Sequence, residues 1–367
     1  MNEQRVSVAL GERSYEIVIG NGLMARAGAL CQAVMPAKRA IVITDRNVDG
    51  YYGMALQQSF QGTGIAMHSI VVAPGEGSKS FASYERVMEE VLALQPDRKT
   101  TLIALGGGVV GDLTGFVAST LLRGVPFIQI PTSLLAQVDS SVGGKTAINT
   151  RAGKNLVGSF YQPRLVLADT DTLATLPPRE MRAGYAEVIK YGLIADADFY
   201  HWCLQHAEAM LAGDAALLSQ AIAKSCVMKA AIVAEDEREA DRRALLNFGH
   251  TFAHALETET GFSEKLLHGE AVAIGMVMAA RLSARMGLVD SALEQKLATH
   301  FRNLGMMAEP RDLAHDWRAE AIARHFANDK KAEAGALTFI ALRALGEAKV
   351  AREVDAMLAL EVVQSYL

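Results

Sequence analysis

The chain has 367 residues, of which 50% are hydrophobic, and its formal net charge is −5. This length and composition allow a large buried core and favour two domains over one. The small net charge, without a long run of one sign, excludes the basic footprint of a protein that binds nucleic acid or an anionic membrane surface.

The cysteines and the apolar segments predict a soluble, cytoplasmic protein without a membrane or nucleic-acid partner. Cys31, Cys203 and Cys226 are widely spaced and form no CxxC motif, so neither a zinc knuckle nor a disulfide framework is expected. Charged residues recur through residues 1–20, unlike in a signal peptide. The longest apolar run, 271–280, is half a membrane span and is interpreted as a buried helix.

The first half alternates short β-rich runs with helical stretches such as 80–94. The expected strands are 39–44, 67–72, 100–105, 127–130 and 165–168. The central ones are apolar enough to be covered on both faces, which is typical of a parallel sheet. We therefore expect a Rossmann-like α/β domain over residues 1–177.

A glycine loop follows the expected strand 100–105 and opens a helix. It reads Gly106-Gly107-Gly108-Val-Val-Gly111-Asp112 and satisfies GxGxxG. Free backbone N–H groups at such a helix start bind a diphosphate, although a turn serving only tight packing accounts for the glycines equally well. The usual acidic residue about twenty positions on is missing. Asp45 is the alternative ribose contact, and a helix-capping role explains it as well.

Two further loops combine glycine with charged residues. One is Pro74-Gly-Glu76-Gly-Ser-Lys79, and the other runs over 131–149 with Asp139 and Gly143-Gly144-Lys145. Lys154 and Asn155 follow shortly after. Lysines flanked by glycine at loop bends favour phosphate or polyol contacts over a merely solvated loop.

After Pro177-Pro178 the pattern becomes helical, with many segments rich in Ala, Leu and Met. The expected helices are 179–194, 215–234, 244–259, 268–286, 291–303 and 317–326. A short run at 336–342 is compatible with one late strand. We expect a helical domain over residues 178–367.

Three of the nine histidines fall close together at His250, His254 and His268. His250 and His254 are four residues apart, so a helix places them one turn apart on the same face. Two buried imidazoles need partners for their nitrogens, which a divalent metal or backbone carbonyls supply. The spacing alone leaves both readings open.

Seven motifs together resemble the 3-dehydroquinate synthases of the sugar phosphate cyclase superfamily. They begin at Pro74, Gly106, Arg123, Pro131, Ala186, Leu245 and His268, and the match runs in order from about residue 40 to about residue 345. The segment 131–145, Pro-Thr-Ser-Leu-Leu-Ala-Gln-Val-Asp-Ser-Ser-Val-Gly-Gly-Lys, is the most specific of them.

The resemblance implies an α/β Rossmann-like N-terminal domain, an all-α C-terminal domain, bound NAD, one Zn²⁺ or Co²⁺ ion and a homodimer. It implies a shikimate-pathway lyase for aromatic amino acid biosynthesis. The substrate would be a phosphorylated keto sugar acid, 3-deoxy-D-arabino-heptulosonate 7-phosphate, and the products 3-dehydroquinate and phosphate. The implied steps are transient oxidation by NAD, phosphate elimination, re-reduction and intramolecular aldol closure.

The resemblance also assigns site residues. The metal ligands would be Glu187, His250 and His268. The substrate-binding and catalytic set would be Asp139, Lys145, Lys190, Lys229, Arg243, Asn247, His254, Lys330 (favoured over Lys331) and Arg123 from the neighbouring subunit. The NAD contacts would be Asp45, Glu76, Lys79, Gly106, Gly107, Gly108, Gly111, Asp112, Thr132, Ser133, Lys145, Lys154, Asn155, Thr172 and Thr175.

Three alternatives stand beside this reading. A metal-dependent alcohol or glycerol dehydrogenase shares the architecture but does not need the basic set Lys145, Lys190, Lys229 and Arg243. A sister sugar phosphate cyclase would differ in only a few pocket residues. A non-catalytic NAD-binding protein would be expected to have lost a ligand or a lysine, and none is lost.

Overall fold

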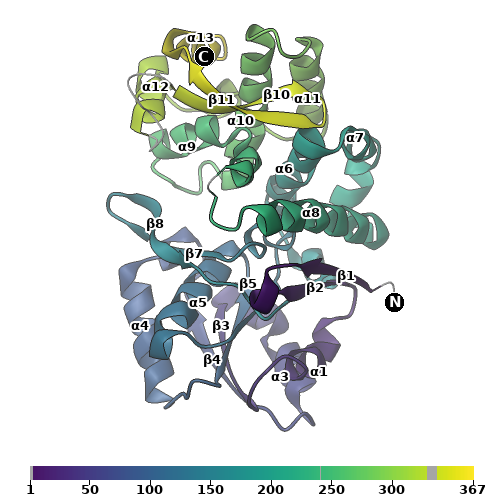
Figure 1. Cartoon of the computed structure of the whole chain (residues 1–367), viewed down its shortest axis with the longest axis vertical. Helices are drawn as coiled ribbons and strands as arrows, with labels where there is room; N and C mark the ends of the chain where they lie inside the picture. The colour runs from purple at the N-terminus through teal and green to yellow at the C-terminus, as the bar shows by residue number, and fades with distance from the viewer. Residues whose placement is uncertain (1–2, 240, 329–336) are drawn as a thin grey trace. The chain divides into compact units, whose positions relative to one another are not determined.

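The computed structural model describes residues 3–239, 241–328 and 337–367. Lys330 and Lys331 therefore lie outside the described residues. The chain divides into two compact units, one comprising residues 1–177 with 213–238 and the other residues 178–212 with 239–367. We describe each unit by itself (Figure 1).

A seven-stranded sheet forms the centre of the first unit, in the order β1-β2-β9-β6-β5-β3-β4. Its strands are β1 (Gln4–Val8), β2 (Tyr15–Gly20), β3 (Arg39–Asp45), β4 (Ala66–Val72), β5 (Thr101–Gly106), β6 (Phe127–Pro131) and β9 (Leu165–Asp169). Every neighbouring pair is parallel except β1 with β2. The five expected strands are confirmed, and the antiparallel pair β1–β2 is an addition at one edge.

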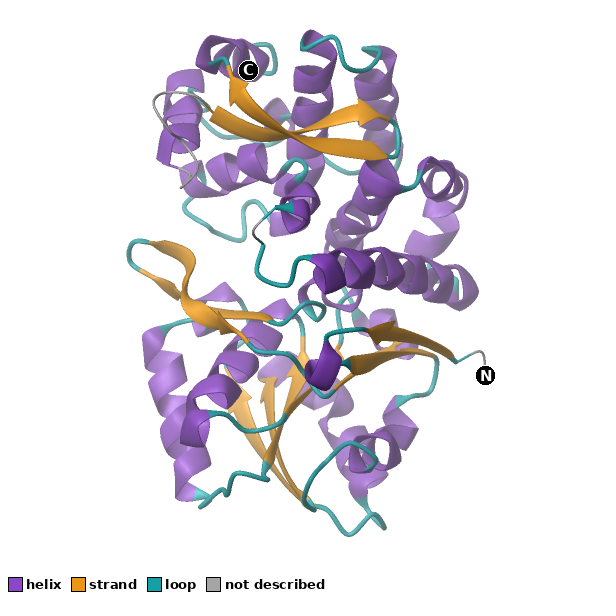
Figure 2. Cartoon of the chain, viewed as in Figure 1, coloured by secondary structure: helices purple, strands orange, loops and turns teal. Residues whose placement is uncertain are grey.

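Helices cover both faces of this sheet, as the continuous apolar strands require (Figures 1 and 2). One face packs against α4 (Phe81–Ala93) and α5 (Gly108–Thr120), with Val87, Val91 and Leu113 in the shared core. The other face packs against α1 (Ala27–Gln32) and α3 (Met54–Phe60). The expected Rossmann-like α/β architecture is confirmed.

Short turns complete the first unit. They are η1 (Gly11–Arg13), η2 (Met24–Arg26), α2 (Arg46–Val48), η3 (Asp49–Gly53), η4 (Glu76–Ser78), η5 (Leu121–Arg123), η6 (Ala136–Ser140) and η7 (Thr170–Thr175). The segment 131–149 was expected to be one loop, and this was wrong. It holds η6 and then β7 (Lys145–Thr150), which pairs antiparallel with β8 (Gly153–Phe160). The hairpin forms because Thr146, Ala147 and Ile148 are buried.

Helix α8 (Ala215–Glu235) belongs to the first unit, although its position in the chain predicted that it would belong to the helical domain. It packs against β1, β2 and η6, and the Gln4 amide donates to Ser219 Oγ at 3.0 Å. Among the described residues, α8 is the one helix long and apolar enough to cross a membrane, and 56% of its apolar window is buried. Its burial against the sheet accounts for the apolar composition.

The second unit is built from helices and one hairpin. The helices are α6 (Pro178–Ala195), α7 (Ala197–Leu211), α9 (His250–Glu259), α10 (His268–Arg285), α11 (Ala292–Asn303), α12 (Ala319–Asn328) and α13 (Ala356–Gln364), with turns η8 (Arg242–Asn247) and η9 (Pro310–Asp312). The hairpin pairs β10 (Leu337–Ala344) with β11 (Glu347–Val354). The strand expected at 336–342 is thus one of two, and the unit is helical without being purely α.

The expected helix 244–259 is interrupted at Gly249, which has φ +83°. A Cβ at this position would lie 2.7 Å from the backbone nitrogen of Met276, so the close approach also requires glycine. A 3₁₀ turn precedes the break and α9 begins at His250. The prediction of one continuous helix was wrong, because the chain turns at Gly249 before it enters α9.

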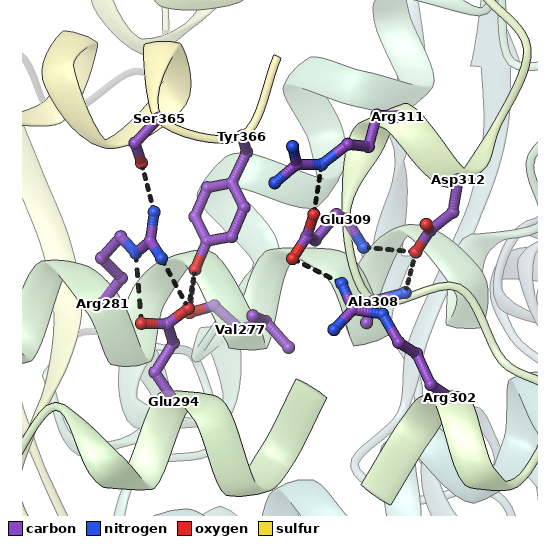
Figure 3. A network of polar contacts seen from close by, with 10 residues as sticks. All are labelled: Val277, Arg281, Glu294, Arg302, Ala308, Glu309, Arg311, Asp312, Ser365 and Tyr366. Carbon is purple, nitrogen blue, oxygen red and sulfur yellow. Dashed lines mark hydrogen bonds and ion pairs between the residues drawn. The ribbon is translucent and has the colours of Figure 1, made fainter. Parts of the chain in front are cut away.

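A polar network fastens the C-terminal residues to α10 and α11 (Figure 3). Glu294 accepts from the Arg281 guanidinium at 3.0 and 3.1 Å and from the Tyr366 hydroxyl at 2.6 Å. Arg281 also donates to Ser365 Oγ at 2.6 Å and lies 4.1 Å above the Tyr366 ring. Tyr366 is fully buried, so the network holds the C-terminal residues against α10 and α11.

Candidate active site

The glycine loop and Asp45 lie at adjacent strand ends. Gly106 is the last residue of β5 and Asp45 is the last residue of β3, and these strands are parallel neighbours. From β3 the chain continues outward to β4 and then returns to the other side of β3, so the strand order reverses between β3 and β5. Nucleotides bind outside the carboxyl ends of the strands at such a reversal.

Glycine is required in the loop for close approach. Gly107 is the N-cap residue of α5. A Cβ on Gly108 would lie 2.9 Å from Ser140 Oγ, and one on Gly111 would lie 2.7 Å from Gln129 Oε1. The missing Cβ at Gly108 lets Ser140 approach the start of α5, and the one at Gly111 lets α5 pack closely on β6. The close-packing use of glycine considered from the sequence is therefore present, and binding of a diphosphate stays a prediction.

Four expected NAD contacts form one polar cluster around Lys79. Its Nζ lies 2.6 Å from Asp112 Oδ2, 2.5 Å from Asn155 Oδ1 and 3.9 Å from Glu76 Oε1. Lys79 is only 5% exposed, so it needs these partners. Asn149, which we did not predict, donates to Glu76 Oε1 at 2.7 Å. Its position at the end of the unusual 131–149 segment was the available signal.

The remaining expected NAD residues have local structural contacts. The Asp45 carboxylate accepts from the backbone N–H groups of Asn47 and Val48 at 2.9 and 3.1 Å, so the capping role is present. The Thr132 N–H donates to the carbonyl of Gly106 at 3.1 Å. The other contacts are Ser133 Oγ with Ala136 N, Thr172 Oγ1 with the Asp169 carbonyl and Thr175 Oγ1 with the Tyr52 hydroxyl. Lys145 begins β7 and Lys154 lies on β8.

Helix α8 brings two expected substrate residues together. The ammonium group of Lys229 donates to the Asp139 carboxylate at 2.9 Å and to the Asp139 carbonyl at 2.6 Å. Lys229 is 5% exposed. A helix from later in the chain thus anchors the end of η6, the turn that carries Asp139.

Arg123 lies in an unusual backbone segment. Leu122, Arg123 and Gly124 have successive φ values of +49°, +69° and +118°. A non-glycine residue in the left-handed region costs about 1–3 kcal/mol, and such strain gathers at functional sites. The Arg123 side chain is exposed on the first unit.

In the second unit, Glu187, His250 and His268 form a compact cluster. The Nε2 atoms of His250 and His268 lie 3.5 and 3.6 Å from Glu187 Oε1. The candidate ligand atoms of all three residues lie within 4.8 Å of one another. Glu187 is fully buried. One carboxylate and two imidazoles around a common point fit a divalent metal that keeps coordination positions open.

The two histidines differ in proton affinity. Burial lowers the pKa of His250 to about 3, and the Lys190 ammonium adds to this effect. Burial alone would lower the pKa of His268 too, but the carboxylates of Glu257 and Glu187 raise it to about 10. In the metal-free protein, His250 is therefore ready to ligate, whereas His268 must first lose a proton.

Helix packing fixes the three ligand positions. Glu187 lies on α6, His250 is the first residue of α9 and His268 is the first residue of α10. A Cβ on Gly269 would overlap the Ala183 carbonyl of α6, and one on Gly275 would overlap the Gly249 carbonyl before α9. Because glycine stands at both crossings, the backbones approach closely enough to bring the three candidate ligands together.

The other expected residues of this unit lie around the cluster. Lys190 Nζ is 2.5 Å from Glu187 Oε2, and both Lys190 and Arg243 are 1% exposed. The Asn247 amide donates to Glu239 Oε1 at 2.8 Å. The His254 ring is exposed, with its centroid 5.6 Å from that of His250 and 6.2 Å from that of His268.

Sequence reasoning missed two acidic residues here. Glu239 contacts Asn247, and Glu257 lies 3.2 Å from His268 Nδ1. The signal for Glu257 was its spacing, seven residues after His250, which places the two on one face of a helix.

Sequence comparison decides the family. Residues 69–183 match the family model described as 3-dehydroquinate synthase N-terminal, and residues 184–332 match the one described as 3-dehydroquinate synthase C-terminal. The chain belongs to the 3-dehydroquinate synthase family. The family prediction made from the motifs is confirmed.

Curated members of the 3-dehydroquinate synthase family match nearly the whole chain. The protein from Rhodospirillum rubrum is 53% identical over 352 residues, which cover 95% of this chain and 91% of the relative. The protein from Caulobacter vibrioides is 51% identical over 352 residues, which cover 95% of both. Both are named 3-dehydroquinate synthase.

Solved structures of related cyclases confirm the fold. A 2-epi-5-epi-valiolone synthase from Streptomyces hygroscopicus with NAD⁺ and Zn²⁺ bound has a TM-score of 0.88 and 28% identity over 99% of both chains. A 2-deoxy-scyllo-inosose synthase complexed with carbaglucose-6-phosphate, NAD⁺ and Co²⁺ has a TM-score of 0.87 and 27% identity, covering 99% of this chain. A glycerol dehydrogenase from Schizosaccharomyces pombe is similar in fold alone, at 16% identity and a TM-score of 0.68.

Proposed function

We propose that this protein converts 3-deoxy-D-arabino-heptulosonate 7-phosphate to 3-dehydroquinate and phosphate, as a phosphate-eliminating lyase of the shikimate pathway. The observation that carries the proposal is the cluster of buried Glu187 and His250 with partly exposed His268, with Lys190 beside it. Relatives named 3-dehydroquinate synthase at 51–53% identity support the same substrate.

The cluster suits Zn²⁺ or Co²⁺, the ions named for the two related cyclases. We assign Glu187, His250 and His268 as the ligands. When bound, the ion supplies Lewis acidity toward adjacent hydroxyl groups of the substrate. The chain would supply three ligand groups: a buried carboxylate on α6 and two Nε2 atoms from the first turns of α9 and α10.

We assign NAD binding to the first unit. The residues at the carboxyl ends of β3 and β5 suit a dinucleotide, with the start of α5 facing its diphosphate. The cluster of Glu76, Lys79, Asp112 and Asn155 offers charged and amide groups for further contacts. Bound NAD⁺ supplies reversible hydride transfer.

The basic residues suit a substrate with a phosphate at one end and a carboxylate at the other. Lys145, Lys190, Lys229 and Arg243 provide the charge-assisted contacts, and Asp139 and Asn247 provide polar contacts to hydroxyl groups. Three of these basic residues are buried in the structure, which strengthens their attraction for an anion. Lys330, outside the described residues, completes the set.

We propose His254 as the group that moves a proton to and from the substrate. It lies one turn along α9 from His250, its ring is exposed, and imidazole exchanges protons near neutral pH. It can therefore meet a substrate without holding the metal.

We further propose a cytoplasmic homodimer in which the partner subunit supplies its own copy of Arg123 to the active site. The support is the left-handed backbone at Leu122 and Arg123 and the exposure of the arginine side chain. Strain of this kind persists where a side chain must be presented in a set direction.

Incubation with the keto acid phosphate, NAD⁺ and Zn²⁺ tests the function. We expect release of inorganic phosphate and formation of 3-dehydroquinate, with no net accumulation of NADH. Stoichiometric NADH without phosphate would instead identify a dehydrogenase. Phosphate release with a different cyclic product would identify a sister cyclase.

A further inference from the structure

Glu257 is a buried carboxylate beside the metal cluster to which we have so far given no role. It lies on α9, two turns after His250, and is 2% exposed. Its neighbours Ala253, Ala255 and Leu256 are buried apolar residues. A carboxylate in such surroundings is costly unless a donor satisfies it, so its presence calls for a specific partner.

That partner is the imidazole of His268. Glu257 Oε2 lies 3.2 Å from His268 Nδ1, while His268 Nε2 faces Glu187 Oε1 at 3.6 Å. The two ring nitrogens therefore point to different carboxylates. His250 repeats the arrangement, with Nε2 facing Glu187 at 3.5 Å and Nδ1 facing the Phe248 carbonyl at 3.3 Å.

We infer that Glu257 is a positioning residue that holds His268 with Nδ1 as the hydrogen-bond donor and Nε2 turned toward the metal. This rests on the proposed metal site. Metal-ligating histidines commonly donate their second N–H to a carboxylate or carbonyl, which fixes the tautomer and increases the basicity of the ligating nitrogen. Here the carbonyl serves His250 and the carboxylate serves His268.

Glu257 is not itself a ligand of that metal. His254, Glu257 and His268 also bring candidate ligand atoms within 4.8 Å of one another. However, Glu257 faces the Nδ1 edge of His268, whereas Glu187 and the metal position lie at the Nε2 edge. The imidazole ring thus separates Glu257 from the point shared by Glu187 and His250.

The backbone on both sides of this contact is fixed. The Glu257 carbonyl accepts from the Phe262 N–H at 2.8 Å, which ties the end of α9 to the following turn. Glu270 accepts from the Leu267 N–H at 2.8 Å and from the Arg179 guanidinium at 2.6 Å, which fixes the first turn of α10. Because the backbone is held at both residues, the Glu257 contact affects mainly the orientation of the His268 ring.

The test is zinc affinity, measured by competition with a chromogenic chelator, on the wild type and on Glu257→Ala, Glu257→Gln and Glu259→Gln. We expect Glu257→Ala to weaken zinc binding roughly 10- to 100-fold. Glu257→Gln keeps an acceptor oxygen for Nδ1–H, so it should recover most of the affinity. Glu259, on the same helix, contacts His325 instead, and its variant should bind zinc as the wild type does.

Co²⁺-substituted protein gives a second readout. The visible absorption of bound Co²⁺ should keep its intensity in Glu257→Gln, because the ligands are unchanged, and should shift in Glu257→Ala. Wild-type affinity and an unchanged spectrum in Glu257→Ala would overturn the positioning role. Equal and complete metal loss in Glu257→Gln and Glu257→Ala, with folded protein by circular dichroism, would make Glu257 a ligand and also overturn it. Failure of the wild type to bind zinc would instead refute the metal site.

Discussion

At the scale of single residues, the proposed metal chemistry of the second unit depends on one carboxylate and two imidazoles. His250 and His268 face the same Glu187 oxygen at nearly equal distances, yet their proton affinities differ greatly. Burial lowers the pKa of both rings, but the carboxylates of Glu257 and Glu187 raise that of His268. The Lys190 ammonium lowers the pKa of His250 further. At the second ring nitrogen, His250 has a neutral carbonyl, whereas His268 has the charged Glu257. A metal held by the proposed ligands would therefore compete with a proton at His268 only.

We expect zinc binding to release about one proton near neutral pH. The pKa of His268 is raised to about 10 in the metal-free protein, so this residue is protonated at pH 7 and must become neutral to ligate. The apparent zinc affinity should therefore rise about tenfold per pH unit over the neutral range. Calorimetry in buffers of different ionisation enthalpy measures the protons released. A value of zero would show that His268 is already neutral.

His268→Ala should abolish both activity and stoichiometric zinc, because it removes one of three ligands. His254→Ala should keep its zinc and lose rate, because its exposed ring lies beside the cluster and not in it. Zinc content by atomic absorption and phosphate release distinguish the two variants. Full zinc and normal turnover in His268→Ala would refute the ligand assignment. Zinc loss in His254→Ala would instead indicate that His250 and His254, one helical turn apart, bind the metal together.

At the scale of elements, the ligand geometry depends on glycine at helix crossings. α10 crosses α6 at Gly269 and approaches the turn before α9 at Gly275, and any side chain there would overlap a backbone carbonyl. In a helix interior, alanine is normally more favourable than glycine by about 1 kcal/mol of helix-forming free energy. The helix propensity and the packing therefore oppose each other at these positions, and packing decides.

Gly269→Ala should destabilise the protein by about 1–3 kcal/mol, because the added methyl group forces α10 away from α6. It should also weaken zinc binding, since His268 is the adjacent residue. Urea unfolding and chelator competition measure the two effects. Gly50→Ala, at a helical glycine with open space around the Cβ position, is the matched control and should leave zinc binding unchanged without destabilising the protein.

Tyr366→Phe should destabilise the second unit by about 1–3 kcal/mol, because buried Glu294 loses the hydroxyl donor at 2.6 Å. Arg281 still pairs with Glu294, so the carboxylate keeps a charged partner. Thermal unfolding measures the loss, and zinc affinity should stay at the wild-type value because the network is separate from the ligands. Unchanged stability would show that the packing of the ring, and not the hydroxyl group, holds the C-terminus.

At the scale of the whole molecule, chemistry is divided between two units that are each discontinuous in sequence. The first holds the glycine loop, the Lys79 cluster and the Lys229–Asp139 pair, and the second holds the metal cluster. Helix α8 carries Lys229 back to the first unit, after the chain has already entered the second. The residues that we propose to bind the substrate are thus distributed over both units.

Arg123→Ala should reduce activity at least tens-fold while NAD⁺ binding stays unchanged, because one charge-assisted contact to an anionic substrate contributes about 2–3 kcal/mol. Phosphate release and NAD⁺ titration measure the two properties. Mixing Arg123→Ala with a His268→Ala subunit should restore part of the activity if the arginine acts across a dimer. No recovery in a mixed dimer would place Arg123 within its own subunit's site.

The sequence by itself determined the family, the central strands and most helices, and it singled out the three residues that the structure brings together as candidate ligands, because these follow from local periodicity and from residue types in ordered motifs. Spacing along α9 left the partner of His250 open, and the family resemblance selected Glu187 and His268. Only the tertiary structure decided how these three side chains meet, because the approach of α6 and α10 places Glu187 and His268 beside His250.

The same holds for the elements that sequence reasoning missed. The break at Gly249, the packing of β7 against α5 and the return of α8 depend on segments distant in the chain, and the contact of Glu257 with His268 joins two different helices. Periodicity reports which face of an element is buried, but not against what it is buried. The partner of a buried side chain, and with it the chemistry of that side chain, is therefore set by packing.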